Sequence, residues 1–147
     1  MSEYTQTYSA KIAASPEECF RVVTDFPAYP RWSSPIKECR VVEAYPDGLP
    51  KHVAFTLEMP LKTIRYTLEY AYQAPHSVRW HLVEGDVKDV QGSYDFSVAG
   101  SGTSATCTQE IDLGFWVPGP IRRMFEQKAL RDSVEEFRAA VESRTGA

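Results

Sequence analysis

The sequence predicts an α+β fold in which a long C-terminal helix covers one face of a curved antiparallel sheet of seven strands. Apolar and polar residues alternate in seven segments, which is typical of half-buried strands. From Leu130 onward, apolar residues recur at Val134, Phe137 and Val141, at the spacing of one helix face. A single helix does not fill the trough of a curved sheet, so the same pattern predicts a cavity between the two.

The chain begins with a strand and a short helix. Residues 4–12 alternate between apolar and polar side chains and are predicted as the first strand. A helix is predicted over residues 16–24, because Ser15 is a good N-cap and Glu18 completes a capping box. Pro27 ends this helix, since proline lacks a backbone donor and clashes with the preceding turn.

The remaining strands follow in hairpin succession, separated by turn signals such as "PDG" at 46–48 and "AGSGTS" at 99–104. They are predicted at residues 36–44, 51–59, 62–73, 77–84, 89–98 and 103–113. Gly119 and Pro120 then mark the start of the C-terminal helix, with an expected length of about 25 residues. No linker or repeat divides the chain, so one domain is expected over residues 1–147.

Composition excludes several classes of protein. The net charge of −4 disfavours nucleic-acid binding, which requires a cationic surface. There is no run of apolar residues long enough to span a membrane and no N-terminal signal segment, so neither membrane insertion nor export is expected. The three cysteines have neither zinc spacing nor a disulfide pattern. We expect reduced, packed thiols in a cytoplasmic protein without a cofactor.

Four stretches resemble the helix-grip, START-like (SRPBCC) superfamily, in particular its bacterial polyketide cyclase/dehydrase branch. They are "ASPEECFRVVTDFPAYPRW" at 14–32, "WHLVEGD" at 80–86, "GSYDF" at 92–96 and "GFWVPGPIRRMFEQKAL" at 114–130. The resemblance covers nearly the whole chain and implies a sheet wrapped around the C-terminal helix, with one or two short helices after the first strand. It also implies that Phe26, Tyr29 and Trp32 of "DFPAYPRW" pack across one mouth of the cavity, either as a hydrophobic clasp or as a wall for a ligand.

A ligand-binding site is predicted in that cavity. The inward faces of the strands are aromatic, and the hydroxyl of each buried tyrosine needs a partner, which can be a backbone carbonyl, water or a ligand. Gln109 is the best candidate for a polar anchor, and Gly92 is expected to widen the space beside Tyr94. The predicted ligand-binding residues are Trp32, Phe55, Tyr66, Tyr70, Trp80, Tyr94, Phe96, Gln109 and Phe125.

Catalytic and metal chemistry find less support in the sequence. His52 and His81 fall on the polar sides of their strands and His76 in a turn, so no metal site is expected. Arg122 and Arg123 either form a mouth for an anionic group or a solvated helix face. The preferred function is binding of a small apolar ligand such as a lipid, polyketide or isoprenoid. The alternatives are a polyketide cyclase or dehydratase, with catalytic residues unknown, and a partner-binding protein similar to the ribosome-association toxins.

Overall fold

Seven antiparallel strands form one sheet in the order β1-β7-β6-β5-β4-β3-β2 in the computed structural model, which describes residues 5–59, 62–123 and 128–144. The strands are β1 (Thr5–Ile12), β2 (Ile36–Ala44), β3 (Pro50–Met59), β4 (Lys62–Gln73), β5 (Ser77–Gly85), β6 (Asp89–Ala99) and β7 (Gly102–Asp112). The helices are α1 (Pro16–Val23), the 3-10 helix η1 (Phe26–Ala28), α2 (Tyr29–Trp32), α3 (Gly119–Arg123) and α4 (Ala129–Arg144). The predicted α+β fold and its seven strands are confirmed.

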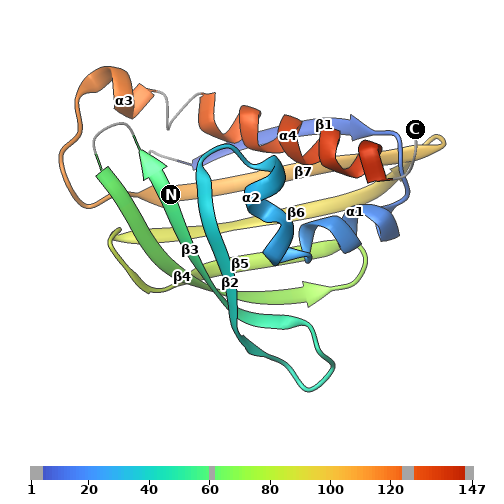
Figure 1. Ribbon diagram of the computed structural model, residues 1–147. Helices are drawn as coiled ribbons and strands as arrows, with labels where there is room; N and C mark the ends of the chain where they lie inside the picture. The colour runs from blue at the N-terminus through green and yellow to red at the C-terminus, as the bar shows by residue number, and fades with distance from the viewer. Residues whose placement is uncertain (1–4, 60–61, 124–127, 145–147) are drawn as a thin grey trace.

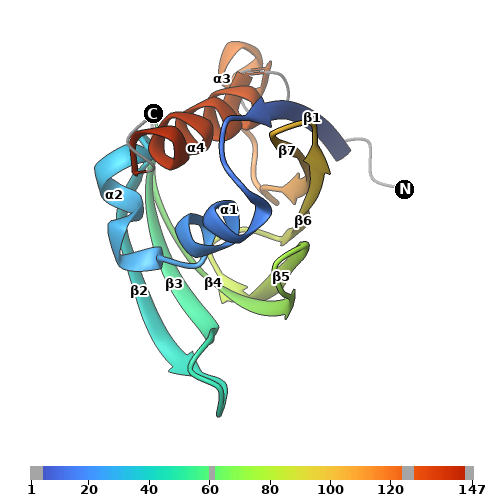
Figure 2. The same cartoon turned by 90° about the vertical axis from the view of Figure 1, so that its right-hand side faces the viewer.

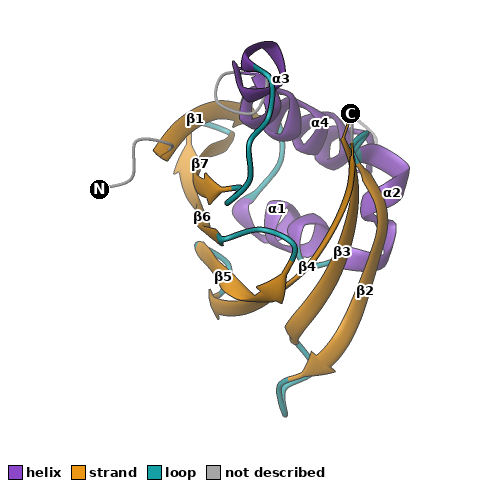
Figure 3. Ribbon diagram, turned by 90° about the vertical axis from the view of Figure 1, so that its left-hand side faces the viewer, coloured by secondary structure: helices purple, strands orange, loops and turns teal. Residues whose placement is uncertain are grey.

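The sheet curves around the helices. Figure 1 shows α4 lying along β1, with which it packs. In the view of Figure 2 the strands turn from β1 at one edge to β2 at the other and leave α1, α2 and α4 on the concave side. Figure 3 shows the connection from β7 to α3 running along one end of this trough. No helix in the described ranges is long and apolar enough to cross a membrane.

The C-terminal helix predicted from Gly119, with an expected length of about 25 residues, is described in two parts, α3 and α4. Residues 124–127, between the two parts, lie outside the described residues. Only α4 carries the predicted apolar stripe, with Leu130, Val134, Phe137 and Val141 buried, whereas α3 buries none of its side chains. The hydrophobic effect therefore holds α4 against the sheet and gives α3 no equivalent anchor.

The predicted inward faces of the strands are confirmed by the register. Residues that lie directly opposite in an antiparallel pair share a face of the sheet. Phe55 lies opposite Tyr66, Trp80 opposite Gly92, and Phe96 opposite Ala105. These residues belong to the core, or pack against it, on the side where Val134, Phe137 and Val141 of α4 are also buried.

The segment "DFPAYPRW" forms a clasp between the sheet and α4. Phe26 is fully buried, with its ring centroid 4.7 Å from that of Tyr70 and 5.1 Å from that of Tyr29. The Tyr29 hydroxyl donates to the carbonyl oxygen of Val23 over 2.5 Å, and the Trp32 ring lies 5.9 Å from that of Phe137. Each proline occupies the first turn of a short helix, where its missing donor costs nothing.

The three cysteines are free and buried, as the sequence predicts. Burial raises the pKa of the Cys19 thiol to about 11 and the pKa values of Cys39 and Cys107 to about 12. The thiolate is the reactive form, so at about pH 8 all three thiols should react very slowly with an aromatic disulfide reagent in the folded protein. Three thiols should be titrated at once when the protein is unfolded in denaturant, whereas fast reaction of a thiol in the folded protein would contradict this burial.

Candidate functional site

A cavity of about 340 Å³ lies between the concave face of the sheet and α4. All seven strands contribute residues to its lining, and its rim comes from the segment after α2 and from the first half of α4. The aromatic lining residues follow from the strand alternation, because every second side chain of a strand points to the same face. Such a mostly apolar enclosure with a few polar groups is typical of small-molecule sites.

The structure brings most of the predicted site residues together. Those that line the cavity are Trp32, Phe55, Tyr66, Tyr70, Trp80, Tyr94 and Gln109. Phe125 lies outside the described residues. Phe96 is not part of the lining, since it is 2% exposed and packs with ring centroids 5.4 Å from Tyr94 and 5.9 Å from Phe137. Its face was predicted correctly, but its position along β6 places it beneath α4 and away from the open space.

The tyrosine hydroxyls differ in their hydrogen-bond partners. Tyr29, Tyr45 and Tyr72 donate to backbone carbonyls, which is the structural role that the sequence left open. The hydroxyls of Tyr66 and Tyr70 line the cavity and make no hydrogen bond to any described residue. Burial raises the pKa of both, so they stay neutral at physiological pH and remain able to donate or accept one bond from a ligand.

Tyr94 lies directly opposite Cys107 on β7, and both residues line the cavity. Burial is the main cause of the raised pKa of Tyr94. Tyr94 and Cys107 therefore form one uncharged part of the cavity wall at physiological pH.

A row of side chains crosses the floor of the cavity. Trp80 on β5 lies opposite Gly92 on β6, and Gly92 lies opposite Gln109 on β7. The Trp80 indole Nε1 donates to Gln109 Oε1 over 3.0 Å. A Cβ at position 92 would come within 2.6 Å of Trp80 Cζ2. The expectation that Gly92 widens the cavity is therefore wrong, because the Trp80 ring occupies the space that the missing side chain leaves.

The charged groups at the rim are each engaged with protein partners. Lys128 pairs with Asp132 at 2.5 Å, and Glu58 pairs with Lys37 at 3.1 Å. Glu136 Oε1 accepts from the backbone N–H of Ser34 over 3.3 Å. Sequence reasoning missed this rim, because residues on the polar side of a helix carry no signal that distinguishes them from ordinary solvated positions.

Sequence reasoning also did not name several apolar lining residues and one buried donor. Leu57 and Ile111 were predicted to face inward but were not singled out as site residues, although strand alternation could have found them. The indole Nε1 of Trp32 is buried and has no partner among the described residues. The sequence could not show this, since the partner of an indole depends on how the clasp packs.

The histidines lie away from the cavity. His52 Nε2 lies 2.9 Å from Glu69 Oε1, and this hydrogen bond is the main cause of the lowered pKa of Glu69. His81 lies 3.8 Å from the same carboxylate on the outer face of the sheet, and His76 Nδ1 contacts the carbonyl oxygen of Phe96 at 3.0 Å. Among the described residues no three potential ligands converge as a metal site would require.

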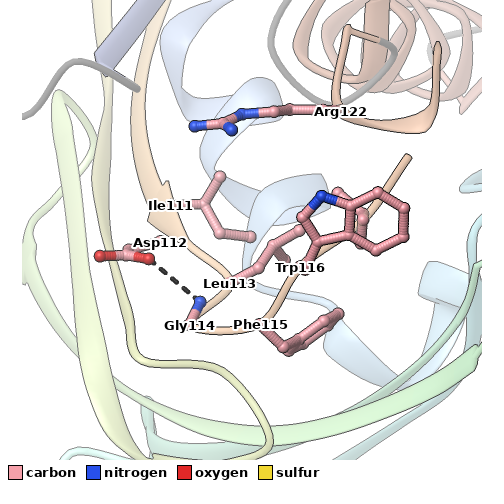
Figure 4. A pocket seen from close by; sticks show the side chains of 8 residues that line it. Ile111, Asp112, Leu113, Gly114, Phe115, Trp116 and Arg122 are labelled. Atoms are coloured by element: carbon pink, nitrogen blue, oxygen red, sulfur yellow. Dashed lines mark hydrogen bonds between the residues drawn. The ribbon is translucent and has the colours of Figure 1, made fainter. Parts of the chain in front are cut away.

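A second hollow, of about 320 Å³, lies beside the first between the end of β7 and α3. Figure 4 shows the Arg122 guanidinium and the Asp112 carboxylate on different sides of it, with Ile111 between them in this view. Asp112 Oδ1 accepts from the backbone N–H of Gly114, which holds the turn, and Trp116 is 83% exposed. Ile111 lines both hollows, so the two lie next to each other.

Comparison with solved structures places this architecture in a known class. A START superfamily protein from Mycobacterium smegmatis has a TM-score of 0.84 at 22% identity, over 95% of this chain and 98% of that chain. The Zhui aromatase/cyclase from Streptomyces sp. R1128 has a TM-score of 0.79 at 15% identity, over 96% and 94%. A STAR-related lipid transfer protein from Xanthomonas axonopodis has a TM-score of 0.72 at 11% identity, over 96% and 95%.

The fold is therefore a START-like helix-grip fold. The chain belongs to the family described as polyketide cyclase/dehydrase and lipid transport, whose profile it matches over residues 5–143. The resemblance stated from the sequence is thus confirmed. No curated protein sequence matches the chain.

Proposed function

We propose that this protein binds a small, uncharged, largely apolar molecule in the cavity between the sheet and α4. The observation that carries the proposal is the cavity itself, with its aromatic walls and with the hydroxyls of Tyr66 and Tyr70, which have no hydrogen-bond partner in the described part of the chain. A lipid, polyketide or isoprenoid would suit such walls, because burying their apolar surface drives binding. The family description, which names lipid transport and polyketide chemistry, supports this class of ligand.

Charge argues for a neutral ligand. Inside the cavity the described walls are apolar or uncharged, and the charged groups Glu58, Lys128, Asp132 and Glu136 have protein partners. An ionised group in the interior would lose its hydration without gaining an ion pair, which is costly. Uncharged polar groups of a ligand do not carry this cost where a hydrogen-bond partner faces them.

A polyketide cyclase or dehydratase activity is the second candidate. The structural similarity to an aromatase/cyclase favours it, although that similarity at 15% identity concerns the fold alone. Proton transfer near neutral pH works best with a group whose pKa lies close to the working pH. Burial raises the pKa of Tyr66, Tyr70 and Tyr94, so these phenols do not suit that role, and we therefore favour binding without turnover.

The proposal predicts that a neutral fluorophore, N-phenyl-1-naphthylamine, binds with a rise in its own emission. Leu57→Trp should weaken this binding by about tenfold or more, because the indole fills space that the ligand would use. Leu113→Trp is the matched control, since Leu113 lines only the neighbouring hollow. Native mass spectrometry with solvent extraction of the purified protein should identify a bound apolar molecule.

The fluorophore titration and the mass spectrometry together distinguish ligand binding, catalysis and partner binding. An absence of both fluorophore binding and a co-purified molecule would contradict ligand binding and would favour the partner-binding alternative. Equal weakening by Leu57→Trp and Leu113→Trp would show that the probe binds elsewhere. A change in the mass of an added oxygenated ligand after incubation would indicate an enzyme.

A further inference from the structure

The hydrogen bond between Trp80 and Gln109 fixes the orientation of an amide in the cavity wall. The indole Nε1–H is a donor without acceptor capacity. It lies 3.0 Å from Gln109 Oε1, so the oxygen of the amide must face the indole and the NH₂ group must face away from it. The orientation therefore follows from chemistry, whereas the two ends of an amide are otherwise hard to tell apart.

The backbone of β6 allows this bond to form across three strands. Trp80 and Gln109 lie on β5 and β7, which are not neighbours, and Gly92 lies between them in the same row. Any Cβ at position 92 would come within 2.6 Å of Trp80 Cζ2 and within 2.6 Å of the Thr108 carbonyl oxygen. Glycine is thus the residue that lets the indole lie over β6 and reach β7.

The Gln109 NH₂ group is left available as a donor. Gln109 lines the cavity, and no hydrogen bond among the described residues uses its Nε2. Gln6 lies opposite Gln109 on β1 and also lines the cavity, but it has no bond to Trp80 that would orient it. A half-buried donor is most stable when an acceptor oxygen faces it.

We infer that Trp80 is a positioning residue that holds the Gln109 amide as a hydrogen-bond donor, so that the cavity selects neutral apolar ligands carrying a carbonyl oxygen directed toward β7. This inference rests on the proposed function, because it concerns the ligand of the same cavity. An apolar ligand of equal shape without that oxygen leaves the donor unpaired when it displaces water. The selectivity thus depends on Trp80 although the ligand contact belongs to Gln109.

Two probes of nearly the same shape test this. 2-Acetylnaphthalene carries a carbonyl oxygen where 2-isopropenylnaphthalene carries a methylene group. The ratio of their dissociation constants should favour the ketone by about threefold to tenfold more in the wild-type protein than in Gln109→Leu, the range of one hydrogen bond. Trp80→Phe should reduce the ketone preference as well, although Gln109 is retained, because the amide is then free to turn.

Gln91→Leu is the matched control and should keep the wild-type preference, since Gln91 is exposed, bonds with Glu110 and does not line the cavity. Gln6→Leu removes the neighbouring amide of the cavity and tests whether that amide is the donor instead. The side-chain ¹⁵N–¹H₂ signals of Gln109 should shift with the ketone and not with the hydrocarbon, a response that a purely structural Gln109 would not give. Thermal melts of all variants show whether each is folded at the temperature of the titration.

The outcomes distinguish the inference from the proposed function. If both probes bind and the ketone preference is the same in wild type, Gln109→Leu and Trp80→Phe, the inference is overturned and ligand binding stands. If Gln6→Leu abolishes the preference and Gln109→Leu does not, the donor is Gln6 and the inference is likewise wrong. If neither probe binds the wild-type protein, the proposed function fails and the inference fails with it.

Discussion

Replacing Phe26 by alanine is expected to lower the free energy of unfolding by about 3–5 kcal/mol. The side chain is fully buried and its ring contacts those of Tyr29, Phe55 and Tyr70, so its loss leaves a cavity at the centre of the clasp. Denaturant titration followed by circular dichroism measures the change. Trp116→Ala is the control, because that large aromatic side chain is 83% exposed and should change stability by only about 0.5 kcal/mol or less.

Phe26 is not part of the cavity lining. The variant should therefore still bind the neutral fluorophore at temperatures where it remains folded. A loss of stability below about 1 kcal/mol would show that the clasp is not a cooperative part of the core. A folded variant that no longer binds would show instead that the clasp shapes the cavity from a distance.

Gly92→Ala is expected to have the second largest effect, a loss of about 1–3 kcal/mol. The new methyl group would lie 2.6 Å from the Thr108 carbonyl oxygen, a backbone atom that cannot move freely, and equally close to the Trp80 ring. The indole must then shift and its bond to Gln109 must break. Thermal melts and the near-ultraviolet circular dichroism of the tryptophans should both report this change.

Gly119→Ala is the matched control for this substitution. A Cβ at position 119 would lie 3.6 Å from Arg123 Nη1, an ordinary contact, and alanine favours a helix more than glycine does. Its stability should stay within about 0.5 kcal/mol of wild type or rise slightly. If Gly92→Ala is equally harmless, the close approach of Trp80 to β6 is not maintained in solution.

Most of the fold could be predicted because it depends on local patterns. Strand alternation identifies the inward face of β4 and β5 even without a partner strand, since a side chain can point only to one face or the other. The apolar stripe of α4 could be predicted for the same reason, since its spacing of three and four residues identifies one face of a helix.

The site was predictable only in part, because it depends on distances between elements. Alternation selects Trp80 and Gln109 as inward residues, but only the register shows that they lie in one row with Gly92. The same pattern cannot tell that Phe96 lies under α4 while Tyr94 reaches the cavity. The spacing of apolar residues does not identify rim residues such as Glu136, because their role depends on where α4 meets the segment after α2.

The strand order has a consequence for synthesis on the ribosome. β1 pairs with β7, so the first strand has no neighbour until residues as late as Glu110 have been made. By contrast, each of β3 to β7 pairs with the strand made just before it. The α4 side chains that cover the aromatic face emerge later still. The growing chain must therefore expose a hairpin meander with an uncovered apolar face, which makes this stage prone to aggregation and a natural substrate for chaperones.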